Sequence, residues 1–206
     1  MATEEVEMSG WNAITDAFLK LYPGQTDPLH FGTLISWRLG GDCPLDGVSV
    51  YDGGEYYHLV SYGLSELYEK ESENKEYSGY GFEFTMKLKK SSLKDENNEL
   101  KCAVGILQSL ATETYTRGEI FSPYEYVYTG QAHGIDVEGI SKLTGFVTVL
   151  DEAGEIDTPN GKVQFVQLVG MTDDELQQIM QKKKTVQELI TELGHTMTDY
   201  QRDSME

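Results

Sequence analysis

The chain has 206 residues, of which 39% are hydrophobic and 11% aromatic, which is enough apolar material to bury the core of one domain. It carries 16 lysine and arginine residues against 35 aspartate and glutamate residues, for a formal net charge of -19. Phosphate binding needs a basic surface, so this charge argues against direct binding to nucleic acid or an anionic membrane. A basic protein is the better candidate partner, although such a charge also serves solubility alone.

The chain shows no targeting, membrane or disulfide pattern. Its two cysteines, Cys43 and Cys102, lack Cys-x-x-Cys spacing, so reduced thiols are expected. The first ten residues, MATEEVEMSG, are acidic, and no stretch approaches the roughly 18 apolar residues of a membrane span. We therefore expect a cytoplasmic protein.

The first 62 residues predict a helix followed by a pair of strands. Apolar residues recur at helical spacing over residues 11–22, and Pro23-Gly24 ends the helix. Residues 48–51 and 56–62 are rich in β-branched and aromatic side chains and flank an Asp-Gly-Gly turn, which predicts two antiparallel strands.

A charged loop and an alternating strand come next. Residues 69–76 lack apolar side chains and predict a solvated loop. Residues 80–89 alternate strictly, which predicts a strand with one buried face and one solvent face. The polar positions, expected in solvent, are Gly81, Glu83, Thr85, Lys87 and Lys89.

The second half predicts two helices with strands between them. Residues 100–111 show one apolar helix face, residues 124–128 predict short strands only, and residues 146–150 and 163–169 predict longer strands. Thr172-Asp-Asp-Glu175 is a capping-box pattern, and it opens a helix that runs to Leu193 before a Gly194 C-cap.

The order of these elements indicates an α+β fold, with a mixed, mainly antiparallel sheet and packed helices. We expect one domain over residues 1–206 with its core at about 11–193. Residues 1–8 and 195–206 are expected to be flexible.

No pattern of catalytic chemistry stands out, so no enzyme activity, cofactor or metal is expected. The sequence has no Gly-x-Ser-x-Gly elbow and no phosphate-binding Gly-x-x-x-x-Gly-Lys. Its four histidines are scattered, without metal-ligand spacing: His30, His58, His133 and His195.

Several ungapped blocks closely resemble the suppressor-of-fused domain. They are GDCPLDGVSVY (41–51), HLVSYGLSELY (58–68), SGYGFEFTMKLK (78–89) and TPNGKVQFVQLVG (158–170), flanked by Leu21-Tyr22-Pro23 and Glu175-Leu176. The resemblance covers roughly residues 11–193. It implies an α+β fold without catalytic activity.

In animals the family resembles the amino-terminal half of a two-domain protein that sequesters a transcription factor by clamping an extended peptide. Because this chain is expected to lack the second half, it looks like the bacterial branch, which is similar to immunity proteins that neutralise a toxin, often a nuclease. Opposite charge would speed the capture of a basic toxin.

The resemblance implies two acidic partner-binding residues. Glu119, directly after Gly118, and Glu152 are the best matches to the acidic residues of the animal peptide clamp. An aromatic contact of that clamp falls near Leu107, where this sequence departs from the pattern.

The block from Tyr62 to Tyr68 has two readings. Gly63 could permit a tight bend while the tyrosines pack, or Tyr62, Glu66 and Tyr68 could present a binding face, since tyrosine is enriched at interfaces.

The leading hypothesis is an immunity or antitoxin protein that binds a cognate toxin directly. The alternative is an intracellular scaffold or regulator that clamps a linear peptide by strand addition. The oligomeric state is left open.

Overall fold

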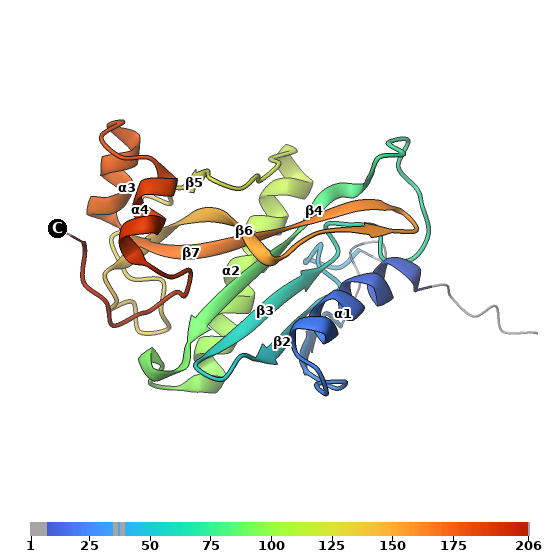
Figure 1. Ribbon diagram of the computed structural model, residues 1–206, viewed down its shortest axis with the longest axis horizontal. Helices are drawn as coiled ribbons and strands as arrows, with labels where there is room; N and C mark the ends of the chain where they lie inside the picture. The colour runs from blue at the N-terminus through green and yellow to red at the C-terminus, as the bar shows by residue number, and fades with distance from the viewer. Residues whose placement is uncertain (1–7, 35–36, 38–39, 206) are drawn as a thin grey trace, which may run out of the picture.

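The computed structural model describes residues 8–34, 37 and 40–205, and shows a seven-stranded sheet with helices on both faces (Figure 1). The strand order is β1-β2-β3-β4-β7-β6-β5. The pairing of β4 with β7 is parallel, and the other pairs are antiparallel. The predicted α+β class is confirmed.

The strands have the following bounds: β1 Leu29–Gly32, β2 Gly47–Asp52, β3 Tyr56–Tyr62, β4 Tyr77–Lys89, β5 Tyr126–Val127, β6 Leu143–Thr158 and β7 Gly161–Thr172. β6 and β7 extend well beyond the predicted strands and form a long hairpin around the predicted turn. Their register shifts between Leu150 and Glu155, which bends the hairpin. The short strand β1 was not predicted.

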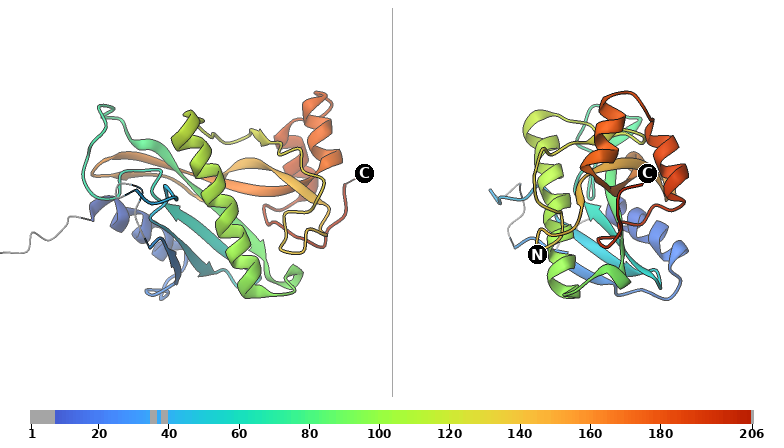
Figure 2. Two further views of the ribbon diagram at one scale, coloured as in Figure 1. Left: turned by 180° about the vertical axis from the view of Figure 1, so that it is seen from behind. Right: turned by 90° about the vertical axis from the view of Figure 1, so that its left-hand side faces the viewer.

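The α-helices are α1 Ser9–Leu21, α2 Glu96–Arg117, α3 Asp173–Met180 and α4 Val186–Leu193. α2 crosses one face of the sheet and α1 lies on the other, while α3 and α4 lie near the end of the β6–β7 hairpin (Figure 2). Three apolar clusters follow this division: one beneath α2, one beneath α1 and one beneath α3 and α4. α1 and α2 thus each cover a stretch of sheet of their own, and α3 and α4 share a third.

The prediction that one face of β4 lies in solvent is wrong. Phe82, Phe84 and other apolar side chains of β4 pack toward α2, as expected. On the opposite face Glu83 and Thr85 are fully buried and Lys87 is 7% exposed. The reason is that α1 and the bent part of β6 cover this face, and polar partners there satisfy its side chains.

The single predicted helix over residues 172–193 is two helices. The Thr172–Glu175 capping box and the Gly194 C-cap are confirmed. A second capping box, in which Thr185 and Glu188 satisfy each other's backbone N–H groups, starts α4. Lys182 lies between the helices with a positive φ of 57°, which breaks the helical path.

The C-terminal segment, expected to be frayed, packs against the sheet instead. Thr198 bridges to Leu88 of β4, and its backbone N–H donates to the Lys87 carbonyl at 2.7 Å. Arg202 forms an ion pair with the fully buried Glu175 at 2.6 Å. Buried polar groups pin residues 195–205 in place, and an apolar pattern does not reveal such groups. The expected flexibility of residues 1–7 lies outside the described residues.

We predict that Arg202→Met lowers the free energy of unfolding by about 3–5 kcal/mol, because it leaves the buried Glu175 carboxylate without its cation. Urea unfolding followed by circular dichroism measures the change. The matched control is Lys142→Met, which breaks an exposed ion pair with Asp203 and should leave the free energy of unfolding nearly unchanged. Equal losses in the two variants would contradict the assignment.

Candidate functional site

The strand β5 forms one edge of the sheet, and its other side carries no further strand of the described residues. Thr148 of β6 holds the segment before β5. Its backbone N–H donates to the Glu125 carbonyl at 2.9 Å and its carbonyl accepts from the Tyr124 N–H at 2.8 Å. Its hydroxyl donates to the Ser122 carbonyl at 2.7 Å. The edge is therefore anchored by one fully buried threonine.

A groove of about 640 Å³ lies beside this edge, between residues 119–126 and the α3–α4 region. Its aromatic and aliphatic wall is unusually open to solvent: Ile120 is 51% exposed, Tyr124 50% and Tyr126 45%. Tyr124 has a positive φ of 72°, rare for a bulky residue, so its conformation is strained. The opposite wall includes Lys182 and Lys184. The groove therefore combines an apolar wall with charged side chains.

Glu119 lies in this groove. It follows Gly118, which ends α2 in the left-handed conformation with φ of 73°. That glycine turns the chain out of α2, so Glu119 and Ile120 are both exposed. The structure therefore places one of the two predicted acidic residues at the sheet edge.

Glu152 lies in a different place, beside the C-terminal end of α1. Its carboxylate is 2.8 Å from the Lys87 ammonium and accepts hydrogen bonds of 3.4 Å from the hydroxyls of Tyr22 and Tyr56. None of these residues lines the groove that contains Glu119. The structure does not bring the two predicted acidic residues into one site.

A series of buried hydrogen bonds lies behind Glu152. His58 is fully buried, with Nε2 at 2.8 Å from the Asp151 carboxylate and Nδ1 at 2.7 Å from the Tyr22 hydroxyl. Burial opposes ionisation of Asp151, but hydrogen bonds from His58, the Ala153 N–H and Thr85 lower its pKa below the usual value. These hydrogen bonds join α1 to β3, β4 and β6. The spacing of the residues in the sequence did not predict them.

Leu107 is fully buried in the core beneath α2. Leu107 therefore offers no exposed surface to a partner in this structure. Leu107, where the sequence departs from the family pattern, is thus an interior residue.

The Tyr62–Tyr68 block is mainly interior. Tyr62 is 1% exposed and stacks on Trp11 with ring centroids 4.3 Å apart. At Gly63, with φ of 138°, a Cβ atom would lie 2.9 Å from the Leu45 Cα, so the predicted tight bend is confirmed. Tyr68 is half-buried and donates to Asp46 at 2.9 Å.

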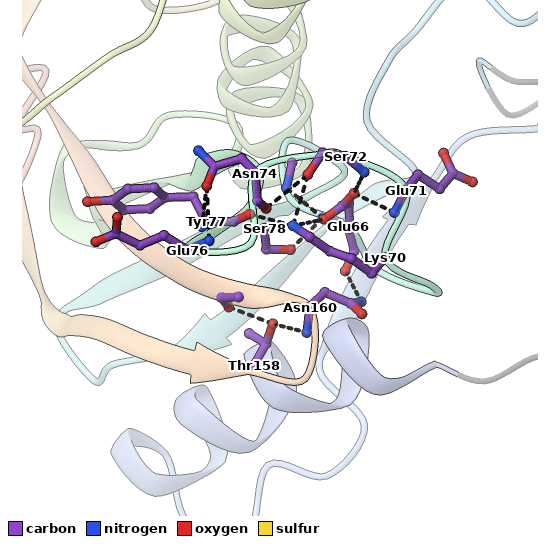
Figure 3. A network of polar contacts seen from close by, with 12 residues as sticks. Glu66, Lys70, Glu71, Ser72, Asn74, Glu76, Tyr77, Ser78, Thr158 and Asn160 are labelled. Carbon is purple, nitrogen blue, oxygen red and sulfur yellow. Dashed lines mark hydrogen bonds and ion pairs between the residues drawn. The ribbon is translucent and has the colours of Figure 1, made fainter.

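Glu66 is the centre of the loop network in Figure 3. Its carboxylate accepts from the Lys70 ammonium at 2.8 Å, and from the backbone N–H groups of Glu71 at 2.7 Å and Gly79 at 3.0 Å. Burial opposes its ionisation, but these donors lower its pKa to about 2. Binding of a partner through Tyr62 or Glu66 would require this region to open, and partner contact by Tyr62, Glu66 and Tyr68 stays a prediction.

Glu83 is a buried carboxylate that alternation had assigned to solvent. It accepts from the Ser61 and Ser65 hydroxyls at 2.5 and 2.7 Å and from the Gly63 N–H at 3.0 Å. Burial outweighs these donors and raises its pKa to about 6. It fixes the bend that starts the β3–β4 connection.

Within residues 8–34, 37 and 40–205, no three His, Cys, Asp or Glu side chains form a group that could hold a metal. None of the helices described is long and apolar enough to cross a membrane.

Comparison with known proteins identifies the family. The model of the Suppressor of fused protein family matches residues 41–203, so the chain belongs to this family. It is 29% identical to the Suppressor of fused homologs of Homo sapiens and Mus musculus over 189 residues, covering 84% of this chain and 37% of each homolog. The chain thus spans little more than a third of these curated relatives.

Two solved structures are similar in fold. The Sufu–Fu complex crystal structure superposes with a TM-score of 0.82 and 28% identity, covering 96% of this chain and 92% of that one. Drosophila Suppressor of Fused superposes with a TM-score of 0.81 and 28% identity, covering 99% of this chain and 53% of that one. The first of these was crystallised in a complex, as its name states.

We predict that Glu66→Gln destabilises the protein by about 2–3 kcal/mol at pH 7, because it removes the charge that four donors stabilise. The folded pKa lies below the unfolded value of 4.5, so the charge stabilises above pH 4.5 and this contribution is lost as pH falls toward 2.

The difference between wild type and Glu66→Gln should therefore shrink by about 1.4 kcal/mol between pH 7 and pH 3.5 in urea unfolding. Glu73→Gln, an exposed change in the same loop, is the control and should show no such pH dependence. A pH-independent difference for Glu66→Gln would contradict the prediction.

Proposed function

We propose that this protein binds a linear segment of a partner protein along the β5 edge, with no catalytic step. The observation that carries the proposal is the edge strand itself, which has exposed tyrosines beside a groove of about 640 Å³. A peptide added to β5 would gain backbone hydrogen bonds, and the groove would select its side chains.

The groove defines the chemistry of the segment. Tyr126 of β5 lines the groove and is 45% exposed, and Tyr128, directly after the strand, is 41% exposed, so both offer amphipathic contact area near the edge. Glu119 supplies a negative charge, and Lys182 supplies a positive charge across the groove, where the Lys184 ammonium already pairs with Glu192 at 2.6 Å. The best ligand is an extended peptide with an apolar or aromatic residue flanked by charged residues.

Two lines of support come from the family. The chain belongs to the Suppressor of fused family, and a structurally similar member was crystallised as the Sufu–Fu complex. The resemblance of the sequence to a domain that clamps an extended peptide agrees with the open sheet edge. The position of Leu107 in the core means that such a clamp would use a different set of contacts here.

The experiment selects peptides from a random 12-residue library displayed on phage and measures the binding of the selected peptides by fluorescence anisotropy. We expect Glu119→Lys and Tyr126→Ala each to weaken binding at least tenfold, because both side chains border the groove. Glu73→Lys makes the same charge change on a remote exposed loop and should bind normally.

The variant Glu152→Lys tests whether Glu152, the second predicted acidic residue, takes part in peptide binding. Since Glu152 contacts Lys87 beside α1, we expect little direct effect on peptide binding once thermal stability is matched. Selected peptides that bind the Glu119→Lys and Tyr126→Ala variants as tightly as wild type would overturn the β5 site.

A second candidate function is that of an immunity or antitoxin protein that inactivates a basic toxin by direct binding in the cytoplasm. The observation that favours it is the net charge of -19, which accelerates encounter with a basic partner. Protection of cells that co-express a candidate nuclease toxin tests it. Protection lost in Glu119→Lys would place both functions at the same edge.

A further inference from the structure

A second groove, of about 530 Å³, lies against α2, and we call it the α2 groove. Residues 102–110 of α2 contribute one wall, residues 129–136 after β5 contribute the other, and Phe146 of β6 also lines it. It shares no lining residue with the groove of about 640 Å³ that contains Glu119 and Tyr126, which we call the first groove. The two grooves are therefore separate surfaces.

The pairing of β5 with β6 places the two grooves on opposite faces of the sheet. Val127 pairs with Phe146, and both pack in the apolar cluster beneath α2. Tyr126 pairs with Val147, which belongs to the cluster beneath α3 and α4. Since Tyr126 lines the first groove and Phe146 lines the α2 groove, neighbouring positions of β5 face different grooves.

The α2 groove has an apolar wall with room beside it. Ile106 and Leu110 are half-buried, so part of each side chain is open to solvent, and Ile135 lies across from them. At Gly105, apart from the helix backbone around it, no atom of the described residues lies within 4 Å of where a Cβ would be. A side chain from outside can therefore reach the apolar wall.

The polar side chains that line the α2 groove already have partners within the protein. Three of them donate to backbone carbonyls: Ser109 to Gly105 at 2.9 Å, Thr129 to Thr144 at 2.7 Å and Gln131 to His133 at 2.8 Å. Among the described lining residues Asp136 is the charged one, and its carboxylate accepts the N–H groups of Ile140 and Ser141. The groove thus suits an apolar side chain, because a charged one would lose water without gaining a partner.

An extended segment added to β5 would present side chains to both faces. Residues that lie opposite each other in paired strands point to the same face, and successive residues of one strand point to opposite faces. The residue opposite Tyr126 would therefore point toward the first groove. The residue next to it, opposite Val127, would point toward the face of α2.

We propose that the α2 groove is a second subsite of the β5 edge, which takes an apolar side chain from the position next to the one that meets Tyr126. This inference rests on the proposed peptide site. The charged residues of the ligand then lie two positions away from the residue in the first groove, on the face of Glu119 and Lys182. The ligand is an extended peptide with apolar residues at adjacent positions, one for each groove.

Filling the α2 groove tests the proposal. Gly105→Leu adds a side chain where there is room, and leucine is a better helix former than glycine, so the variant should fold. We expect the phage-selected 12-residue peptides to bind it about tenfold more weakly or worse in fluorescence anisotropy, since burial of one aliphatic side chain is worth that factor. Thr116→Leu adds the same side chain on the exposed last turn of α2, outside the groove, and should bind within about twofold of wild type.

Alanine scanning of a selected peptide shows which position enters which groove. The alanine change at the α2-groove position should weaken binding to wild type but have little further effect on binding to Gly105→Leu. The change at the neighbouring position should keep its effect in Gly105→Leu and lose most of it in Tyr126→Ala. Ser109→Leu, exposed on the same wall, replaces Gly105→Leu if that variant fails to fold by circular dichroism.

The variants distinguish failure of the subsite from failure of the peptide site. The α2 subsite alone is overturned if folded Gly105→Leu or Ser109→Leu binds the peptides as tightly as Thr116→Leu does, while Tyr126→Ala binds them more weakly. It is also overturned if the scan finds the same couplings for both neighbouring positions. Normal binding by Tyr126→Ala would overturn the β5 site itself, and the subsite with it.

Discussion

The parallel pairing of β4 with β7 is the constraint on which the rest of this fold depends. It joins two antiparallel units, β1–β4 on one side and the β5–β7 unit on the other, into one sheet. Because the joint lies in the middle of the sheet, both faces of β4 are covered, one by α2 and the other by α1 and β6 (Figure 2). Because both faces are covered, the carboxylates of Glu83 and Asp151 are buried and accept hydrogen bonds from neighbouring side chains.

Much of the fold could be predicted from periodicity. The strands around Tyr51, Tyr62 and Phe84 and the two capping residues Thr172 and Glu175 follow local rules that the structure obeys. Alternation could not show that the polar face of β4 is buried, because it records only the contrast between two faces. The partners that bury it, such as Asp151, come from a strand more than 60 residues away along the chain.

The candidate site was less predictable, for a geometric reason. Glu119 was assigned through the family resemblance alone, from its position directly after Gly118, and the structure places it in the groove beside β5. Glu152 was assigned in the same way, but the register shift in β6 decides which neighbours it meets. The packing of the C-terminal segment was missed because its sequence resembles a flexible tail, and only the contacts of Thr198 with β4 and of Arg202 with α3 show that it is part of the core.

The two-residue length of β5 sets a limit on what can pair with it. A long, flat edge strand would accept another copy of the same sheet and lead to fibrils or domain exchange. The strained Tyr124 interrupts extended backbone just before β5, so only a few main-chain hydrogen bonds are available to any added strand. Backbone pairing at β5 therefore supplies only a small part of the binding energy of any added strand. A segment of the kind proposed above would therefore have to gain most of its affinity from side chains that fit the groove, because the edge offers so little backbone to pair with.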